Sequence, residues 1–142
     1  MADDVQGLTV GSTASFSKEV TAEDITSFAN VTGDHNPLHT DAAYAARTRF
    51  KAPIAHGMLG AGIISAAIGV NLAPGKAVIY MGQNLQFRGP VSAGDTVTAN
   101  VEVTEVIADK SRLMLNTTVV NQDGTEVIRG DATIMVEALT DA

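Results

Sequence analysis

The chain has 142 residues, of which 45% are hydrophobic and 18% are charged, as in a globular domain with a sizeable core. It contains no cysteine, which excludes disulfide frameworks, thiolate metal sites and cysteine nucleophiles. Nine basic and sixteen acidic residues give a net charge of −7. We therefore expect no nucleic-acid partner and no anionic membrane partner, because both are bound through clustered lysine and arginine.

The N-terminus lacks the pattern of a secretory signal, since it is acidic and has no apolar segment. The longest apolar stretch runs from Gly57 to Val70 and is interrupted by Ser65. It falls short of the roughly 20 residues that a membrane span needs. These features predict a soluble, cytoplasmic protein that forms one domain over residues 1–142.

Helical patterns occupy the first half of the chain, after an edge strand expected over residues 10–20. A first helix begins after Thr21, which forms a variant of the capping box with Asp24. It ends at Gly33, because glycine readily adopts the left-handed conformation of a C-terminal cap. A second, short helix is expected from Thr40 to about residue 47.

A third helix begins near Gly57 and ends before Pro74-Gly75. It is apolar on almost every side, so we expect it to be buried over most of its surface. From residue 77 the hydrophobic period changes to two, which predicts antiparallel strands over residues 77–88, 95–107, 111–121 and 125–138. Helices followed by strands predict an α+β domain in which one antiparallel sheet packs on a central apolar helix.

The segment Gly33-Asp34-His35-Asn36-Pro37-Leu38-His39 is the most informative for function. Pro37 excludes a helix interior here and favours an extended Asn36, which leaves Asp34 and His39 at the two ends of a tight loop. A carboxylate and an imidazole that meet on one water form a minimal general acid–base pair. The alternative is structural: Asp34 makes an Asx turn, and His39 caps the next helix.

A second feature lies at His56-Gly57-Met58, where the apolar helix begins. A helix N-terminus presents unpaired N–H groups and partial positive charge. Because Gly57 has no side chain, its N–H is open to a ligand carbonyl, as an oxyanion hole requires. Helix starts of this kind are common, and Ser65 in the same helix is typical of a serine that bonds a carbonyl one turn back.

Phe28 and Ala45 flank the G-D-x-N-P-x-H motif, and Ala55–Met58 and Tyr80–Gln83 add two further segments. Together they resemble the MaoC-like (R)-specific enoyl-CoA hydratases over nearly the whole chain. The resemblance implies a single hotdog fold, in which a curved antiparallel β-sheet wraps around a long central α-helix. It also implies a homodimer with two active sites near the subunit interface.

The resemblance further implies a role for each site residue. Asp34 and His39 would hold the catalytic water, the Gly57 N–H would bind the thioester oxygen, and Asn36 and Ser65 would support them. The reaction would be the reversible addition of water to trans-2-enoyl-CoA, giving (R)-3-hydroxyacyl-CoA. It needs no cofactor, because coenzyme A is part of the substrate. Which of the two side chains is the base is left open.

Arg47, Arg49 and Lys51 form a basic cluster between the two motif segments. We hypothesise that this cluster contacts the phosphates of CoA, and the alternative is a solvated charged loop. We expect no metal site, because His35, His39 and His56 are the only histidines and Pro37 prevents helical ligand spacing.

Other functions remain open at this point. They are an acyl-CoA thioesterase in which Asp34 activates water against the carbonyl carbon, another hotdog dehydratase, and a non-catalytic domain that binds acyl thioesters. Polyhydroxyalkanoate precursor supply, fatty acid β-oxidation and fatty acid synthesis would all fit a hydratase. The small residues of the apolar helix favour short to medium acyl groups.

Overall fold

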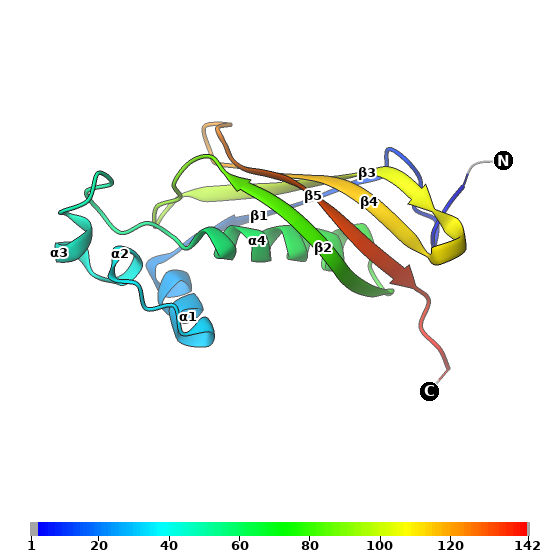
Figure 1. Ribbon diagram of the computed structural model, residues 1–142, viewed down its shortest axis with the longest axis horizontal. Coiled ribbons are helices and arrows are strands. Elements are labelled where there is room, and N and C mark those ends of the chain that lie inside the picture. The colour runs from blue at the N-terminus through cyan, green and yellow to red at the C-terminus, as the bar shows by residue number, and fades with distance from the viewer. Residues whose placement is uncertain (1–2, 142) are drawn as a thin grey trace.

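A curved antiparallel sheet of five strands forms most of the protein (Figure 1). The computed structural model describes residues 3–141. Across the sheet the strand order is β1-β3-β4-β5-β2, so β1 and β2 form its two edges. The strands are β1 (Thr13–Glu19), β2 (Ala77–Phe87), β3 (Thr96–Ile107), β4 (Arg112–Val120) and β5 (Glu126–Glu137). Every predicted strand is therefore confirmed, with slightly shorter bounds.

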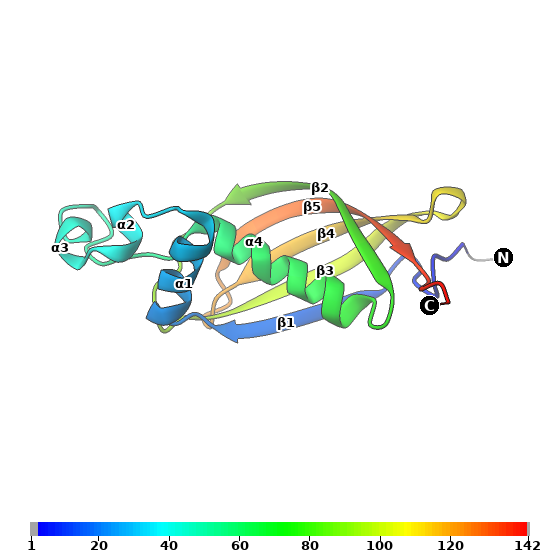
Figure 2. The same cartoon turned by 90° about the horizontal axis from the view of Figure 1, so that it is seen from below.

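The central helix α4 (Gly57–Ala66) lies along one face of the sheet and continues as one stretch of π-helix, η1 (Ala67–Leu72) (Figure 2). Its Ile64 and Ile68 are fully buried and belong to one apolar cluster with the alternate residues of the strands. A Cβ on Gly60 would overlap Cδ1 of Ile128 on β5. Small helix residues therefore let the sheet approach closely, as the apolar-helix pattern predicts.

One face of the central helix is exposed, so the expectation that it is buried on most sides is wrong for the protomer. Met58, Gly62, Ser65 and Gly69 are exposed and recur at the spacing of a single helical stripe. The sheet covers only the opposite face of the helix (Figures 1 and 2). The helix thus has more apolar surface than its own chain covers.

Helix α1 (Ala22–Thr32) has the predicted caps. The Thr21 hydroxyl accepts the Asp24 N–H, and the Asp24 carboxylate accepts the Thr21 N–H, each at 3.0 Å. The hydrogen bond from the Thr21 backbone and the Lys18 ammonium, 2.9 Å away, lower the pKa of Asp24 below its ordinary value. Gly33 ends the helix in the left-handed region, with φ of 83°.

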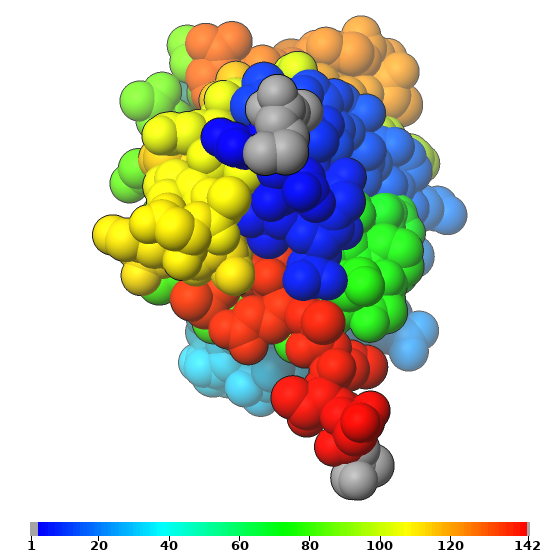
Figure 3. Space-filling view, turned by 90° about the vertical axis from the view of Figure 1, so that its right-hand side faces the viewer, coloured from blue at the N-terminus to red at the C-terminus, as the bar shows by residue number. Residues whose placement is uncertain are grey.

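Two further short helices, α2 (Pro37–Thr40) and α3 (Ala42–Ala45), lie with α1 beyond the end of the sheet where α4 begins (Figure 1). The second predicted helix is confirmed as α3, although Asp41 rather than Thr40 caps it, by accepting the Tyr44 N–H. Figure 3 shows the opposite end, formed by the N-terminal segment, the β3–β4 hairpin and the C-terminal segment. Over residues 3–141, no helix is long and apolar enough to cross a membrane.

Candidate active site

The connection between α1 and α2 carries Asp34, and α2 itself carries His39, the two residues of the proposed acid–base pair. Asn36 caps α2 by accepting the Leu38 N–H at 3.1 Å, and its ψ of 121° is extended, as predicted. Pro37 occupies the first turn of α2, where its missing N–H leaves no helical bond unmade. Pro37 therefore begins a helix and does not lie in a helix interior, as predicted, but His39 lies on this single helical turn and not at the end of a loop.

A backbone carbonyl fixes the His39 ring. Its Nδ1 lies 2.7 Å from the Ile54 carbonyl oxygen. Because a carbonyl oxygen only accepts hydrogen bonds, the hydrogen of this bond is on Nδ1. In the neutral ring the lone pair is then on Nε2, which is the form in which a histidine can accept a proton from water. The ring is half-buried and hydrogen-bonded through Nδ1, and together these restrict the direction of Nε2.

Asp34 is exposed and makes the Asx turn that the structural alternative predicts, since its Oδ1 accepts the Asn36 N–H at 3.2 Å. The turn does not point the carboxylate away from His39. A carboxylate oxygen of Asp34, a ring nitrogen of His39 and a ring nitrogen of His56 all lie within 4.8 Å of one another. One water that bonds to two groups at about 2.8 Å can bridge such a gap.

Gly57 is the first residue of α4 and is exposed, so its N–H is one of those that the helix itself leaves unpaired. A Cβ at this position would lie 2.8 Å from Cε1 of Phe87. A side chain at this position would therefore displace the Phe87 ring, which occupies the space where its Cβ would lie. The position matches an oxyanion site that a side chain would crowd.

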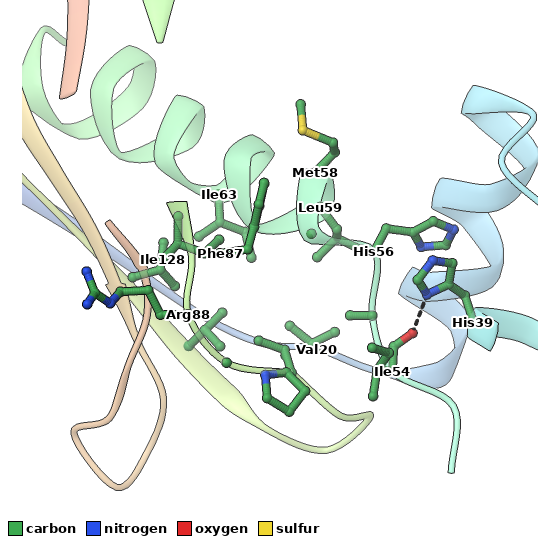
Figure 4. Close-up of a pocket in the computed structure, with 18 of the residues that line it drawn as sticks. Val20, His39, Ile54, His56, Met58, Leu59, Ile63, Phe87, Arg88 and Ile128 are labelled. Atoms are coloured by element: carbon green, nitrogen blue, oxygen red, sulfur yellow. Dashed lines mark hydrogen bonds between the residues drawn. The ribbon is translucent and has the colours of Figure 1, made fainter. Parts of the chain in front are cut away.

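A cavity of about 760 Å³ begins at these groups and extends under the first turns of α4 (Figure 4). His39, His56 and Gly57 line one end of it. Its deeper wall is apolar and consists of Val20, Leu59, Ile63, Val97, Val119 and Ile128. The exposed Asp34 carboxylate does not line the cavity. The cavity thus joins a polar end to an apolar interior, as an acyl thioester would require.

Two arginines line the same cavity. Arg49 is the member of the predicted basic cluster that does so, and its guanidinium lies 4.5 Å from the centre of the Phe50 ring. Arg47 and Lys51 are exposed and do not line it. Arg88 comes directly after the last residue of β2 and also lines the cavity. Nothing in the sequence indicated this role, because no motif accompanies this arginine.

Sequence reasoning also missed the role of His56 in this arrangement. Its side chain is 3% exposed, and its Nε2 lies 3.0 Å from the Asp34 carbonyl oxygen. The His39 and His56 rings stack with their centres 3.9 Å apart. The signal in the sequence was its place directly before Gly57, the candidate oxyanion donor.

Asp34, His39 and His56 offer three ligand atoms close enough together for a metal ion. The two imidazole planes, however, are stacked and only 28° apart. Lone pairs lie in the ring planes, so two stacked rings point theirs nearly side by side, whereas zinc prefers ligands at tetrahedral angles. The arrangement fits a water better than a metal, and a metal-free site stays a prediction.

Ser65 lies apart from these groups. It is exposed on α4, eight residues after Gly57, which corresponds to about 12 Å along the helix axis. Asn36, in contrast, lies within the site and caps the helix that carries His39.

The Tyr80–Gln83 segment supports the sheet. The amide nitrogen of Gln83 donates to the buried Thr117 hydroxyl at 3.0 Å and to the Asp131 carbonyl at 2.9 Å. The Tyr80 hydroxyl donates to the Gln83 side-chain oxygen. Burial raises the pKa of Tyr80 above its ordinary value. These bonds give the polar groups of β2 and β4 partners that they need inside the sheet.

A family model described as the MaoC like domain matches residues 7–125. The chain belongs to this family. Its sequence is 46% identical to an (R)-specific enoyl-CoA hydratase of Aeromonas caviae, over 91% of this chain and 96% of that protein. It is 43% identical to a 3-hydroxybutyryl-CoA dehydratase of Methylorubrum extorquens, over 92% and 82% of the two chains.

Solved structures of this family have the same fold. The R-hydratase PhaJ1 from Pseudomonas aeruginosa, in its unliganded form, matches with a TM-score of 0.86 and 41% identity, over 99% of this chain and 94% of that one. The (R)-hydratase from A. caviae involved in PHA biosynthesis matches with a TM-score of 0.86 and 45% identity, over 92% and 98%. The predicted hotdog fold of this MaoC-like chain is confirmed.

Proposed function

We propose that this MaoC-like protein is a lyase, an (R)-specific enoyl-CoA hydratase that adds water reversibly to trans-2-enoyl-CoA and forms (R)-3-hydroxyacyl-CoA. One observation carries the proposal. The Asp34 carboxylate and a ring nitrogen of His39 lie within 4.8 Å of each other, in a chain 46% identical to an (R)-specific enoyl-CoA hydratase. Gly57 begins the central helix beside the same cavity end that His39 lines.

The reaction needs three groups, and the site offers all of them. The thioester carbonyl makes the β-carbon electrophilic, so a base that removes a proton from water lets its oxygen bond to that carbon. The electron pair of the double bond moves toward the thioester oxygen, where the Gly57 N–H stabilises the negative charge. The α-carbon then takes a proton from an acid, and the thioester carbonyl re-forms.

Asp34 and His39 together supply the base and the acid. General acid–base help is worth about 10²–10⁴-fold in rate, and one oxyanion donor adds about 10²–10³-fold. Two neighbouring titrating groups lose and gain protons as a pair, so the pair rather than either residue has the apparent pKa values that a pH profile reports. We propose that no metal and no separate cofactor takes part, and that EDTA leaves the rate unchanged.

Contact with CoA is proposed for the two arginines of the cavity. Arg49 and Arg88 both line the cavity, and guanidinium forks bind phosphate oxygens well. Of the basic cluster, only Arg49 is therefore proposed to contact the CoA phosphates, and Arg88 is proposed as a second contact. It also explains how a chain with a net charge of −7 binds a polyanionic substrate, because the local charge at the cavity is positive.

A homodimer is part of the proposal, supported by edge strand β2. Its Ile79, Tyr80 and Met81 are 41%, 37% and 45% exposed. An edge strand with apolar side chains and unpaired backbone groups is a natural pairing surface for a second copy. A cytoplasmic location is proposed as well, and cell fractionation tests it.

Hydration of crotonyl-CoA tests the function directly. We expect the conjugated absorbance to fall without release of a free thiol, and chiral analysis to find the (R)-3-hydroxyacyl product. The Asp34→Asn variant should lose most of the rate. Release of free CoA instead would indicate a thioesterase. Unchanged activity in Asp34→Asn would remove the acid–base site, and no activity in the wild type would indicate a non-catalytic binding domain.

A further inference from the structure

We infer that His56 is a positioning residue, which holds the acid–base pair and the oxyanion donor in one fixed arrangement. This inference rests on the proposed function. His56 is the residue directly before Gly57, and its side chain is 3% exposed. Its contacts reach Asp34 and His39, which precede it in the chain and come from a different part of the fold.

The first contact is a hydrogen bond across 22 residues of sequence. His56 Nε2 lies 3.0 Å from the Asp34 carbonyl oxygen. A carbonyl oxygen only accepts, so Nε2 is the donor. The bond ties the backbone that carries the Asp34 side chain to the first turn of the central helix. The direction of the carboxylate therefore depends on the place of His56.

The second contact is with the His39 ring. The two imidazoles stack with centres 3.9 Å apart, and Phe28 packs on His56 with ring centres 4.7 Å apart and planes 47° apart. His39 is thereby held in two ways, by its Nδ1 bond to the Ile54 carbonyl and by the stack on its face. Rotation of the His39 ring about its side chain would break both, so the direction of Nε2 is fixed.

The remaining nitrogen of His56 shows why an imidazole matters here. Nδ1 is buried and has no hydrogen-bond partner among residues 3–141. A buried polar atom without a partner is destabilising, and an apolar ring would fill the same space without that cost. The imidazole is thus favoured for its Nε2–H and not for stability. The ring of His56 contacts Asp34 and His39, and its backbone is joined directly to Gly57; among the described residues of the site, no other residue links all three.

Two variants separate the contacts. His56→Phe keeps a ring for the stack and removes the donor, whereas His56→Gln keeps an N–H near the position of Nε2 and removes the ring. Misplacement of a catalytic group by about 1 Å can cost about 100-fold in rate. We expect His56→Phe to lower kcat for crotonyl-CoA about 10- to 100-fold, with KM changed less than about threefold, and His56→Gln to recover part of the loss. The control is His35→Gln, an exposed histidine of the same loop, which should keep the wild-type kcat.

A double-mutant cycle shows whether His56 acts through Asp34. Added to Asp34→Asn, His56→Phe should cost much less than it does alone, because the group it positions is already inactive. A merely structural role would give the same factor in both backgrounds. Melting temperatures of each variant identify a loss caused by unfolding, and if His56→Phe fails to fold, His56→Gln is placed in the same cycle.

A measurement that needs no activity completes the test. In ¹⁵N-labelled protein, His56→Phe should shift the backbone resonances of His35 and Gly57 and the ring-nitrogen resonances of His39, while His35→Gln leaves Gly57 unchanged. A folded His56→Phe variant with wild-type kcat overturns the inference. If the wild type is inactive but His56→Phe shifts these resonances as expected, the result contradicts only the proposed function.

Discussion

Substitution of Gly57 by alanine tests the oxyanion site with a known geometric consequence. The new Cβ would lie 2.8 Å from Cε1, 2.9 Å from Cδ1 and 3.3 Å from Cζ of Phe87. Contacts below 3.0 Å cannot persist, so the ring must move. Phe87 is 52% exposed at the end of β2, so it has room to turn. The methyl group and the displaced ring should then crowd the N–H that we propose binds the thioester oxygen.

The expected effects on stability and on catalysis therefore differ. Alanine is better than glycine in a helix by up to about 1 kcal/mol, which offsets much of the strain of about 1–3 kcal/mol that an extra methyl group causes in a packed site. The free energy of unfolding should thus change by only about 1 kcal/mol. Misdirection of an oxyanion donor should lower kcat by about 100-fold.

The assay is crotonyl-CoA hydration together with thermal unfolding. Gly62→Ala is the matched control on the same helix, because a Cβ there meets nothing within 4 Å. It should keep the wild-type kcat. Adding Phe87→Leu to Gly57→Ala should recover part of the lost rate, since it removes the atoms that crowd the methyl group. A folded Gly57→Ala variant with wild-type kcat would refute the assignment of this N–H to the oxyanion.

Three further predictions concern the acid–base pair, the arginines and the first helix. Asp34→Asn and His39→Ala should each lower kcat about 10²–10⁴-fold, and the double variant should lose little more, because the two groups act on one water; additive losses in the same hydration assay would contradict this. Arg49→Ala and Arg88→Ala should raise KM for crotonyl-CoA with little change in kcat, an effect that added salt should reduce in the wild type; an unchanged KM would remove the CoA contact. Asp24→Asn should lower the free energy of unfolding by less than about 1 kcal/mol at pH 7, because the lost charge lies at the surface near the helix N-terminus and Lys18. Because folding lowers the pKa of Asp24 below its ordinary value of 3.8, this contribution is present above that pH and is lost as the pH falls through the folded-state pKa, so urea unfolding should show the two proteins converging in acid.

Much of the fold is predictable from the sequence, because local interactions set it. The Thr21–Asp24 capping box and the left-handed Gly33 are contacts between neighbours in the chain, and both occur as expected. The period-two pattern likewise places the four later strands. The burial of α4, in contrast, is set by contacts with distant parts of the fold. An apolar composition shows that a helix tends to be covered, but it does not show whether its own chain or another one covers it.

The site is partly predictable for the same reason. Asp34 and His39 lie in one motif, and the short helix that carries His39 changes only how the two are held. His56 and Arg88 join the site through contacts across long stretches of chain. A lone histidine among apolar residues and an arginine after a strand have no pattern that marks them. Their roles become visible only when the fold brings the segments together.

Asp34 and His39 lie in the segment with the short helices α2 and α3, beyond one end of the sheet (Figure 1), whereas β3 and β4 contribute much of the buried interior. A rigid scaffold that carries its chemistry on one appended stretch can be altered in two independent ways. Repacking the interior of β3 and β4, where Val101, Val103 and Leu115 are almost fully buried, should tune heat tolerance. Turnover should respond to the appended stretch instead, which makes the protein a convenient frame for grafting related thioester chemistry.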